Sequence, residues 1–149
     1  MNFTAKEDYG IRAVVDIAAN RGAAPVQTKE IAARQGIPEQ FLEQLLASLR
    51  RAGIIRSIRG AGGGYNLARR ASQITIGDIL RTLSGPIVPI RCVNEPNTAG
   101  CEQEEACGVA DLWRRLTTAI TDVVDTTTVQ DIVDQRQTMR GARSFMMNI

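Results

Sequence analysis

The sequence predicts a mainly α-helical protein in which a winged helix-turn-helix domain, with a small β-wing, precedes a long dimerisation helix. Three observations lead to this fold class. Two helical patterns, 28–35 and 38–52, are joined by a short turn, as in a helix-turn-helix. Two β-like runs follow and enclose the glycine-rich segment 59–64. Farther along, apolar residues between 112 and 123 recur at spacings of four, three and four, which is typical of a coiled-coil seam.

The first three helices are marked by capping signals and apolar faces. Thr4 and Glu7 fit a capping box, so a helix is expected from there to about Asn20. We expect Thr28 to cap the second helix and Gly36 to end it. Pro38 suits the first position of the third helix. That helix is expected to bury one face and expose the other: Phe41, Leu42, Leu45, Leu46 and Leu49 against Gln40, Glu43, Gln44, Ser48 and Arg51.

The β-wing is expected from the runs 54–58 and 65–67, which flank Arg-Gly-Ala-Gly-Gly-Gly at 59–64. A dinucleotide-binding fingerprint would need a glycine at the position of Tyr65 and a helix after it, and neither is indicated. A plain flexible turn is the other alternative, but residues 44–77 carry six arginines and no acidic residue. This charge favours a DNA-binding wing. A further helix at 75–83 and the break at Ser84-Gly-Pro complete a domain that spans residues 1–83.

All three cysteines, Cys92, Cys101 and Cys107, lie in a polar segment that we place at residues 84–109. Its other residues are largely acidic or turn-forming, so packing alone would hold it poorly. A bound metal centre would supply the missing constraint. Because the chain has no histidine, the ligands would be thiolates with carboxylates or weaker donors.

The segment 110–137 is expected to hold the dimerisation helix and one further short helix. Thr126-Thr-Thr128 should interrupt the long helix, and Thr128 with Asp131 should cap the short one, which would end near Gln137. Residues 138–149 are expected to be a loosely held tail. A seam on the long helix usually meets an identical helix in a C2 dimer, with an intramolecular core helix as the alternative. The seam residues are Leu112, Leu116, Ala119 and Val123, widened by Trp113 and Ile120.

Composition excludes several classes of protein. With 44% hydrophobic and 23% charged residues, the chain resembles an ordinary soluble protein. No apolar run approaches the roughly 20 residues that span a bilayer, and the N-terminal residues lack the apolar core of a signal peptide. A cytoplasmic location away from membranes is therefore expected, where cysteines stay mostly reduced. An odd count of three cysteines also argues against a closed disulfide framework. The absence of histidine removes the commonest general base, which makes an enzyme the least expected class.

The two parts of the chain differ in charge. Residues 1–83 carry 12 Lys and Arg against 7 Asp and Glu, a net charge of +5, whereas residues 84–149 carry 6 against 9, a net charge of −3. The first part is therefore expected to meet a polyanion, namely double-stranded operator DNA. Amides read adenine and acids accept from cytosine, so the expected base readers are Gln40, Glu43, Gln44 and Ser48. Phosphate contacts are expected from Arg50, Arg51, Arg56 and Arg59, and further DNA contacts from Thr28 and Gly60.

Residues and spacing alone leave the chemistry of the cysteine segment open. An iron–sulfur cluster is compatible, because thiolates hold such clusters and their spacing can be irregular. Zinc would prefer tight C-x-x-C pairs and four good ligands. A metal-free thiol switch and buried structural cysteines are the remaining alternatives. Cys107 falls at the start of the long helix, whose N-terminal dipole favours an anionic thiolate or cluster.

Taken together, these segments resemble the Rrf2 family of bacterial winged-helix repressors, in particular its IscR-type members. The matching pieces are FLEQL at 41–45, SIRGAGGGY at 57–65, IGDIL at 76–80, and the three cysteines followed by Leu112-Trp113. The resemblance covers nearly the whole chain to about residue 137. It implies a homodimer joined by the long helix. It also implies a cluster held by Cys92, Cys101 and Cys107, whose presence or state alters operator binding.

The fourth ligand is where the chain departs from the IscR-type pattern, which has a histidine three residues after the last cysteine. Here that position is Ala110. The nitric-oxide-sensing NsrR-type members instead resemble this chain at Asp8, where an aspartate from the first helix of the partner subunit completes the cluster. The resemblance thus implies Asp8 as leading fourth ligand and a 4Fe-4S cluster, with 2Fe-2S as the alternative. The other candidates are an external small molecule or water, Glu102, Glu104, Glu105 and Asp111.

The sequence therefore predicts a DNA-binding transcriptional repressor that senses iron–sulfur status, redox or nitrosative stress through its cysteines. Two alternatives stay open. One is a small iron–sulfur electron-transfer protein whose basic domain docks an acidic partner. The other is a winged-helix regulator that senses through its thiols without a cluster.

Overall fold

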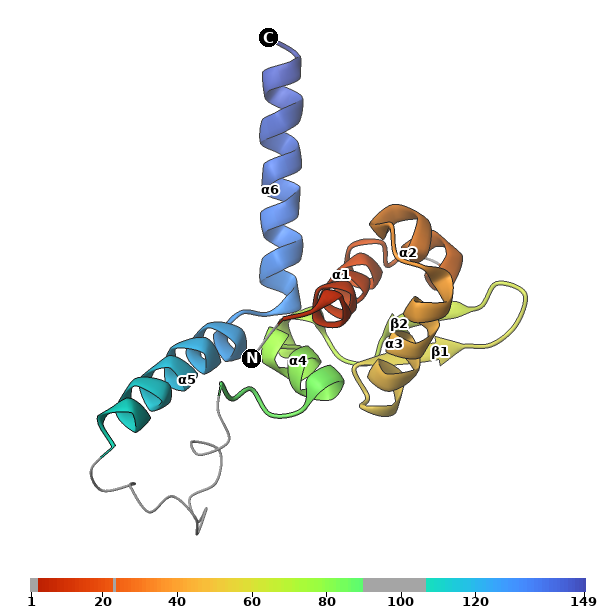
Figure 1. Cartoon of the computed structure of the whole chain (residues 1–149). Helices are drawn as coiled ribbons and strands as arrows, with labels where there is room; N and C mark the ends of the chain where they lie inside the picture. Colours follow the sequence, from red (N-terminus) through yellow and green to blue (C-terminus); the bar gives the residue numbers. More distant parts are fainter. Residues whose placement is uncertain (1–2, 23, 90–106) are drawn as a thin grey trace.

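The structure is a computed structural model that describes residues 3–22, 24–89 and 107–149. Figure 1 shows α1 and α4 in the middle, with α2, α3 and the strands on one side and α5 on the other. Six α-helices and a two-stranded antiparallel sheet confirm the predicted mainly α-helical fold with a small wing. In chain order the elements are α1 (Ala5–Ala19), α2 (Thr28–Gln35), α3 (Glu39–Arg51), β1 (Ile55–Ile58), β2 (Gly64–Leu67), a 3-10 turn (Ala71–Gln73), α4 (Ile76–Ser84), α5 (Gly108–Thr126) and α6 (Val129–Met147).

Capping boxes start α1, α4 and α6 at Thr4, Thr75 and Thr128. In each, the threonine backbone N–H donates to an acid three residues later, at 2.8 to 3.1 Å. The prediction that Thr28 caps α2 is wrong by one position. Gln27 is the N-cap, because its backbone N–H donates to the Glu30 carboxylate at 2.9 Å. The helix begins where an acidic side chain, three residues after the N-cap, accepts a hydrogen bond from the N-cap backbone N–H.

The turn between α2 and α3 depends on Gly36. Its φ of 65° and ψ of 37° are left-handed values, which glycine adopts without the steric penalty of a Cβ. The chain then places Ile37 in the core at 4% exposure, and Pro38 precedes the first turn of α3. Near the start of α3, Phe41 packs edge-on against Tyr9 of α1, with ring centroids 5.9 Å apart. This contact fixes α3 to α1.

The wing is a two-stranded β-hairpin that an isolated bridge joins to the chain before α2. Ile55 pairs with Leu67 and Ile58 with Gly64, and Val26 forms an isolated bridge with Tyr65. The two bridge hydrogen bonds measure 3.0 and 2.8 Å. A Cβ on Gly64 would lie 2.5 Å from the Val26 carbonyl oxygen, so glycine is required there by close backbone approach. The hairpin is thus anchored to the chain that precedes α2.

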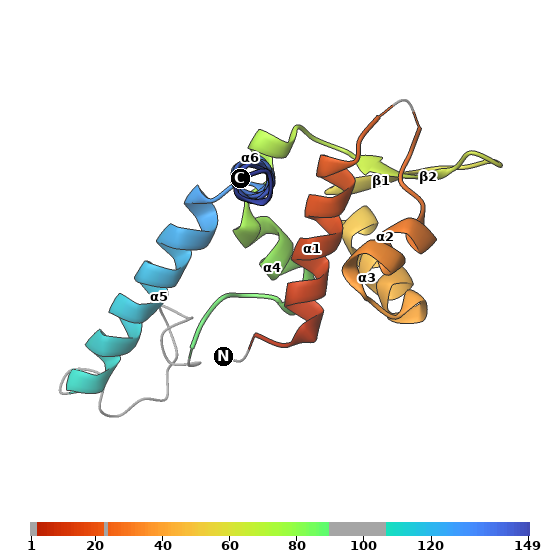
Figure 2. The ribbon, with the colours of Figure 1, turned by 90° about the horizontal axis from the view of Figure 1, so that it is seen from above.

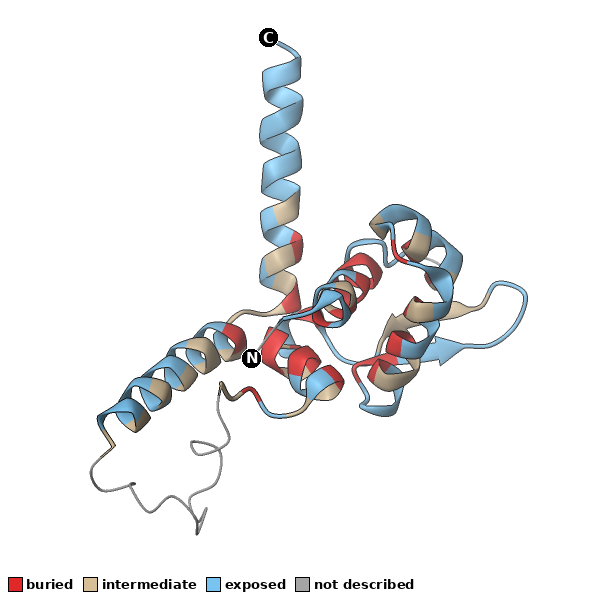
Figure 3. Ribbon diagram, viewed as in Figure 1, coloured by how far each residue is buried: buried red, intermediate tan, exposed pale blue. Residues whose placement is uncertain are grey.

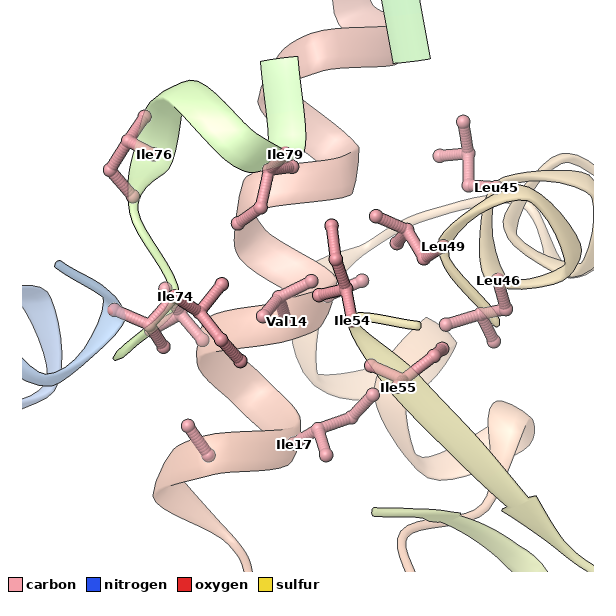
Figure 4. Packing of buried hydrophobic residues seen from close by; sticks show 14 of the residues in the cluster. Val14, Ile17, Leu45, Leu46, Leu49, Ile54, Ile55, Ile74, Ile76 and Ile79 are labelled. Carbon is pink, nitrogen blue, oxygen red and sulfur yellow. The ribbon is translucent and has the colours of Figure 1, made fainter. Parts of the chain in front are cut away.

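One hydrophobic core connects the central helices. Figure 4 shows Val14 and Ile17 of α1 beside Leu49 of α3, Ile54 and Ile55 at the start of β1, and Ile79 of α4. Figure 3 shows that buried residues concentrate in α1, α3, α4 and the base of α6. Val129 and Val133 of α6 are 0% and 5% exposed, so the start of α6 packs on the winged domain.

The C-terminal part contains one confirmed and one wrong prediction. The helix is interrupted at the expected threonines, since α5 ends at Thr126 and α6 begins at Val129. Thr127 donates from Oγ1 to the Val123 carbonyl at 2.7 Å, a side-chain bond that competes with continued helix. The expectation of a short helix that ends near Gln137 is wrong, because α6 continues to Met147. Residues 138–149, which were expected to be a loosely held tail, are all exposed. Within the described ranges, no helix combines the length and apolarity needed to cross a membrane.

Candidate DNA-binding surface and cysteine site

The polar face of α3 is exposed as the helical spacing predicts. Gln40, Glu43 and Gln44 are exposed and Ser48 is half-buried, while Leu42, Leu45, Leu46 and Leu49 on the opposite face are buried. Among the described residues, no ion pair within 4.0 Å involves Glu43. Its carboxylate is therefore available to accept from a base, and we call the four residues Gln40, Glu43, Gln44 and Ser48 the reading face.

The four arginines that were expected to contact phosphates are all exposed. Arg50 and Arg51 are exposed in the last turn of α3, Arg56 is exposed on β1, and Arg59 is exposed in the tip of the hairpin beside Gly60. Within residues 3–22, 24–89 and 107–149, none of these four arginines forms an ion pair. Arg51 instead donates to Ser48 Oγ at 3.3 Å. Thr28, half-buried, opens α2.

The carboxylate of Asp16 holds α2 in place, a role that was not predicted from the sequence. Asp16 is 0% exposed. Arg34 of α2 donates to it from Nε at 3.0 Å and from Nη2 at 2.7 Å, and Gln35 Nε2 donates to Oδ1 at 2.8 Å. A buried carboxylate needs such partners to offset desolvation. An acidic residue within the apolar run 13–18 was the sequence signal that could have predicted a buried carboxylate here.

A second buried carboxylate, Glu7, ties the start of α1 to the end of α4. Glu7 is 6% exposed and accepts from Thr4 N at 2.8 Å and from Ser84 Oγ. Burial raises the pKa of Glu7, but the hydrogen bonds from Ser84 and Thr4 outweigh it and lower the pKa from 4.5 to about 2. The carboxylate stays charged beside a cavity of about 230 Å³, which is lined by Phe3, Glu7, Leu80, Ser84 and residues 85–88.

Of the four expected cluster ligands, the structure describes two. Cys107 is half-buried and is the N-cap of α5, with no side-chain capping hydrogen bond. Asp8 lies in the first turn of α1 and pairs with Arg12 at 3.1 Å, with 55% of its side chain exposed. Cys92 and Cys101 lie outside the described residues, and within the described ones no three potential metal ligands gather. Figures 1 and 2 both place the start of α5, which Cys107 caps, well apart from α1, which carries Asp8.

The seam of α5 is exposed on this chain. Leu112, Leu116 and Val123 are 55%, 41% and 65% exposed, and Val109 at 56% extends the seam by one step. Ala119 is exposed as well. Of α5, which is described throughout, Val124 alone is buried. The residues that were expected to widen the seam, Trp113 and Ile120, are half-buried.

Comparisons with known proteins agree with this arrangement. A profile of the Rrf2 family, described as an iron-dependent transcriptional regulator, matches residues 3–135. The HTH-type transcriptional regulator CymR of Bacillus subtilis is 38% identical over 145 residues, which cover 97% of this chain and 99% of CymR. The HTH-type transcriptional regulator IscR of Escherichia coli is 34% identical over 139 residues, which cover 93% of this chain and 84% of IscR.

Two solved structures share the fold over most of their length. CymR of B. subtilis, described as its global cysteine regulator, gives a TM-score of 0.74 at 36% identity and covers 91% of this chain and 98% of its own. IscR of T. potens gives a TM-score of 0.72 at 35% identity, and the match covers 91% of this chain and 88% of the IscR chain. These relatives are named as regulators, which agrees with a non-enzyme and gives no support to an electron-transfer protein. The chain belongs to the Rrf2 family of winged helix-turn-helix transcriptional regulators.

Proposed function

We propose that two copies of this chain bind operator DNA as a repressor and that the state of the cysteine segment sets their affinity. The observation that carries the DNA-binding part is the reading face of α3, exposed beside the unpaired arginines of the wing. A recognition helix of this kind enters the major groove, where amides and acids distinguish base edges. Arg50, Arg51, Arg56 and Arg59 then neutralise phosphates on either side, and Thr28 and Gly60 approach the backbone.

The homodimer is supported by the exposed seam of α5. Val109, Leu112, Leu116, Ala119 and Val123 follow one another at spacings of three and four along one face. A contiguous apolar stripe of this kind marks an interface, and pairing of the same stripe on two copies gives a closed two-fold dimer. Such a dimer would present two reading faces to two half-sites of one operator.

The sensing part is proposed as an iron–sulfur cluster, 4Fe-4S in preference to 2Fe-2S, held by Cys92, Cys101, Cys107 and the partner's Asp8. The two described ligands fit this role. Cys107 lies at the N-terminus of α5, whose helix dipole is favourable to an anionic cluster. The Asp8 side chain is more than half exposed and is held by one arginine in its own helix, so a second copy can reach it. The cluster would supply a labile iron centre that responds to oxygen, nitric oxide or iron shortage.

A cluster-free thiol sensor is the second candidate, and the likeness to CymR favours it. CymR of B. subtilis is described as a global cysteine regulator, and CymR of Staphylococcus aureus, 34% identical with a TM-score of 0.70, has a structure described as its oxidized form. In this alternative, oxidation of the three cysteines would change operator affinity directly.

Anaerobic purification followed by absorbance, iron and sulfide assays distinguishes the two candidates. A cluster predicts visible absorbance together with iron and sulfide, lost in Cys92→Ala, Cys101→Ala and Cys107→Ala. Titration of DNA from the protein's own promoter should then show affinities of cluster-bound and cluster-free protein that differ by roughly 5- to 150-fold, the range of typical allosteric couplings. Asp8→Ala should retain a less stable cluster and shift the same affinity.

Each outcome of that titration has one interpretation. Protein free of iron whose operator affinity responds to a thiol oxidant would identify the thiol sensor. Equal affinities in all states of the cysteines would contradict both sensing mechanisms while leaving DNA binding intact. Failure to bind any fragment of the promoter would contradict the proposal that this protein is a DNA-binding repressor.

A further inference from the structure

We propose that the Arg81–Asp125 ion pair, with Asp125 seated against Gly77, is a joint that fixes the direction of α5 relative to the reading face. The inference rests on the proposed function, because the joint affects operator binding only if α5 joins two copies. Arg81 and Asp125 are then positioning residues. They determine which separation of two half-sites the dimer accepts.

The helix α5 is held at one end. It packs against α4, and its buried residue, Val124, lies in its last turn. From there the helix runs outward to its start at Gly108, away from α4, as Figure 1 shows. At 1.5 Å per residue, its 19 residues form a helix about 28 Å long that is fixed at its C-terminal end. Any freedom at the held end is therefore magnified at the far end.

At the C-terminal end of α5, Arg81 and Asp125 form a bidentate ion pair. Arg81 of α4 donates from Nη1 to Asp125 Oδ1 at 2.6 Å and from Nη2 to Oδ2 at 2.8 Å. This pairing of a planar guanidinium with a carboxylate fixes orientation as well as distance. The hydrogen bonds from Arg81 also hold the pKa of Asp125 below its ordinary value, so the carboxylate stays charged.

Gly77 brings the two helices close enough for this pair. A Cβ on Gly77 would lie 1.9 Å from Asp125 Oδ1 and 2.7 Å from Arg81 Nη1. Any larger residue at this position would push Asp125 away from α4. Gly77 is the second residue of α4, where glycine has a lower helix propensity than alanine. The close seat of Asp125 is a physical reason for glycine at this position.

Backbone hydrogen bonds hold the connection between α5 and α6. Ile76 N donates to the Thr127 carbonyl, and Val129 N donates to the Ile74 carbonyl, both at 2.9 Å. These two bonds fix the connection against residues 74–76. They lie outside α5, whereas the ion pair at Asp125 holds α5 itself, together with the buried Val124.

The joint acts on the reading face because α4 and α3 share the core. Ile79 of α4 and Leu49 of α3 are both 0% exposed and lie near Ile54 in Figure 4. A close-packed core transmits orientation with little deformation. A tilt of about 10° at the joint would displace the far end of α5 by about 5 Å, by the helical rise. That is about one and a half base-pair steps of duplex DNA.

The first test measures which half-site spacing the dimer prefers. Operators carrying the two half-sites at the natural spacing, and at one or two base pairs more or less, are titrated with wild type, Arg81→Ala and Asp125→Ala. We expect both variants to lose at least about fivefold of the discrimination between spacings, within the range of typical couplings. The exchanged pair Arg81→Asp with Asp125→Arg should recover part of it. Asp122→Ala, a change of an exposed α5 acid that forms no ion pair in the described chain, is the matched control.

The second test needs no DNA. Spin labels are introduced as unnatural amino acids at Lys29 of α2 and Arg114 of α5, and the distance distribution between them is measured in the same variants. The proposal predicts a narrow distribution in wild type and Asp122→Ala, and a broad one in Arg81→Ala and Asp125→Ala. Unchanged distributions together with unchanged spacing preference would overturn the joint. Broadened distributions in a protein that binds no operator would uphold the joint and refute the proposed function.

Discussion

Asp16 is a carboxylate with no exposed surface, and four hydrogen bonds from Arg34 and Gln35 join it to α2. We expect Asp16→Ala to lower the free energy of unfolding by about 2–4 kcal/mol. Breaking one side of a buried pair leaves the partner uncompensated, and the partial exposure of Arg34 at 38% reduces that cost. Urea denaturation measures the difference.

The exposed Asp122→Ala variant is the control and should stay within about 0.5 kcal/mol of wild type. A loss in Asp16→Ala that is no larger than in Asp122→Ala would contradict the stabilising role of the buried hydrogen bonds. Because Asp16 orients α2 against α1, its loss should also weaken operator binding at temperatures where the variant remains folded.

Glu7 gives the stability of the winged domain a dependence on acid. Its pKa is lowered from 4.5 to about 2, since the hydrogen bonds from Ser84 and Thr4 outweigh the effect of burial. A carboxyl whose pKa is lower in the folded state stabilises fully above its unfolded pKa and loses that contribution as the pH falls through the folded pKa. The contribution of Glu7 is therefore lost between about pH 4.5 and about pH 2.

We expect Glu7→Gln to destabilise the protein near neutral pH and to approach wild type as the pH falls toward 2. Chemical denaturation at a series of pH values gives the difference between the two proteins, which cancels the titration of all other carboxylates. Ser84→Ala should reduce the pH dependence in part. A difference that stays constant across this range would contradict the lowered pKa.

Among the elements, those with local signals could be predicted from the sequence. The capping boxes at Thr4, Thr75 and Thr128 involve residues three apart, and the exposed and buried faces of α3 follow a helical period. The end of α6 could not be predicted from periodicity, because its distal half buries no residue on this chain. Residues 135–149 consist largely of good helix formers such as Gln, Met, Arg and Ala, and this propensity was the signal that an apolar pattern misses.

The pairs that position the candidate site carry no local signal. Arg34 and Asp16 are 18 residues apart, and Arg81 and Asp125 are 44 apart. Their meeting depends on how α1, α2, α4 and α5 pack, which residue spacing does not encode. The cysteine site was predicted for a different reason, since its thiols are chemically distinctive and match a family pattern. Its geometry involves Cys92 and Cys101, which lie outside the described residues, so the ligand set stays a prediction.

The wing offers a quantitative test at the scale of one element. Arg59 is exposed at its tip and unpaired within the described chain. If it contacts one phosphate, Arg59→Ala should lower affinity for all duplexes and reduce the slope of log K against log salt by roughly 0.9. Arg143→Ala, on the exposed distal half of α6, should leave the slope unchanged. An unchanged slope in Arg59→Ala would argue against docking of the wing.

At the scale of the whole molecule, the proposed DNA surface and the proposed dimer surface lie on opposite sides. Figures 1 and 2 place α3 and the wing on one side of α1 and α4, and α5 on the other. The segment that carries the cysteines connects α4 to α5. If this segment is the proposed sensor, a change in it acts along the chain between the two surfaces and alters how two reading faces are spaced.

The dimer itself can be tested at the seam. Leu112→Glu would place a carboxylate on each side of a two-fold apolar interface, where desolvation and like-charge repulsion both oppose association. We expect the dimer Kd to rise by roughly 100-fold or more, seen in sedimentation equilibrium as a shift to the mass of one chain. Arg114→Glu adds an acid on the face of α5 away from the seam and should remain dimeric. The monomeric variant should bind a single half-site as wild type does but lose its advantage on paired half-sites. A Leu112→Glu protein that stays dimeric would move the interface away from α5 and leave its exposed seam without this role.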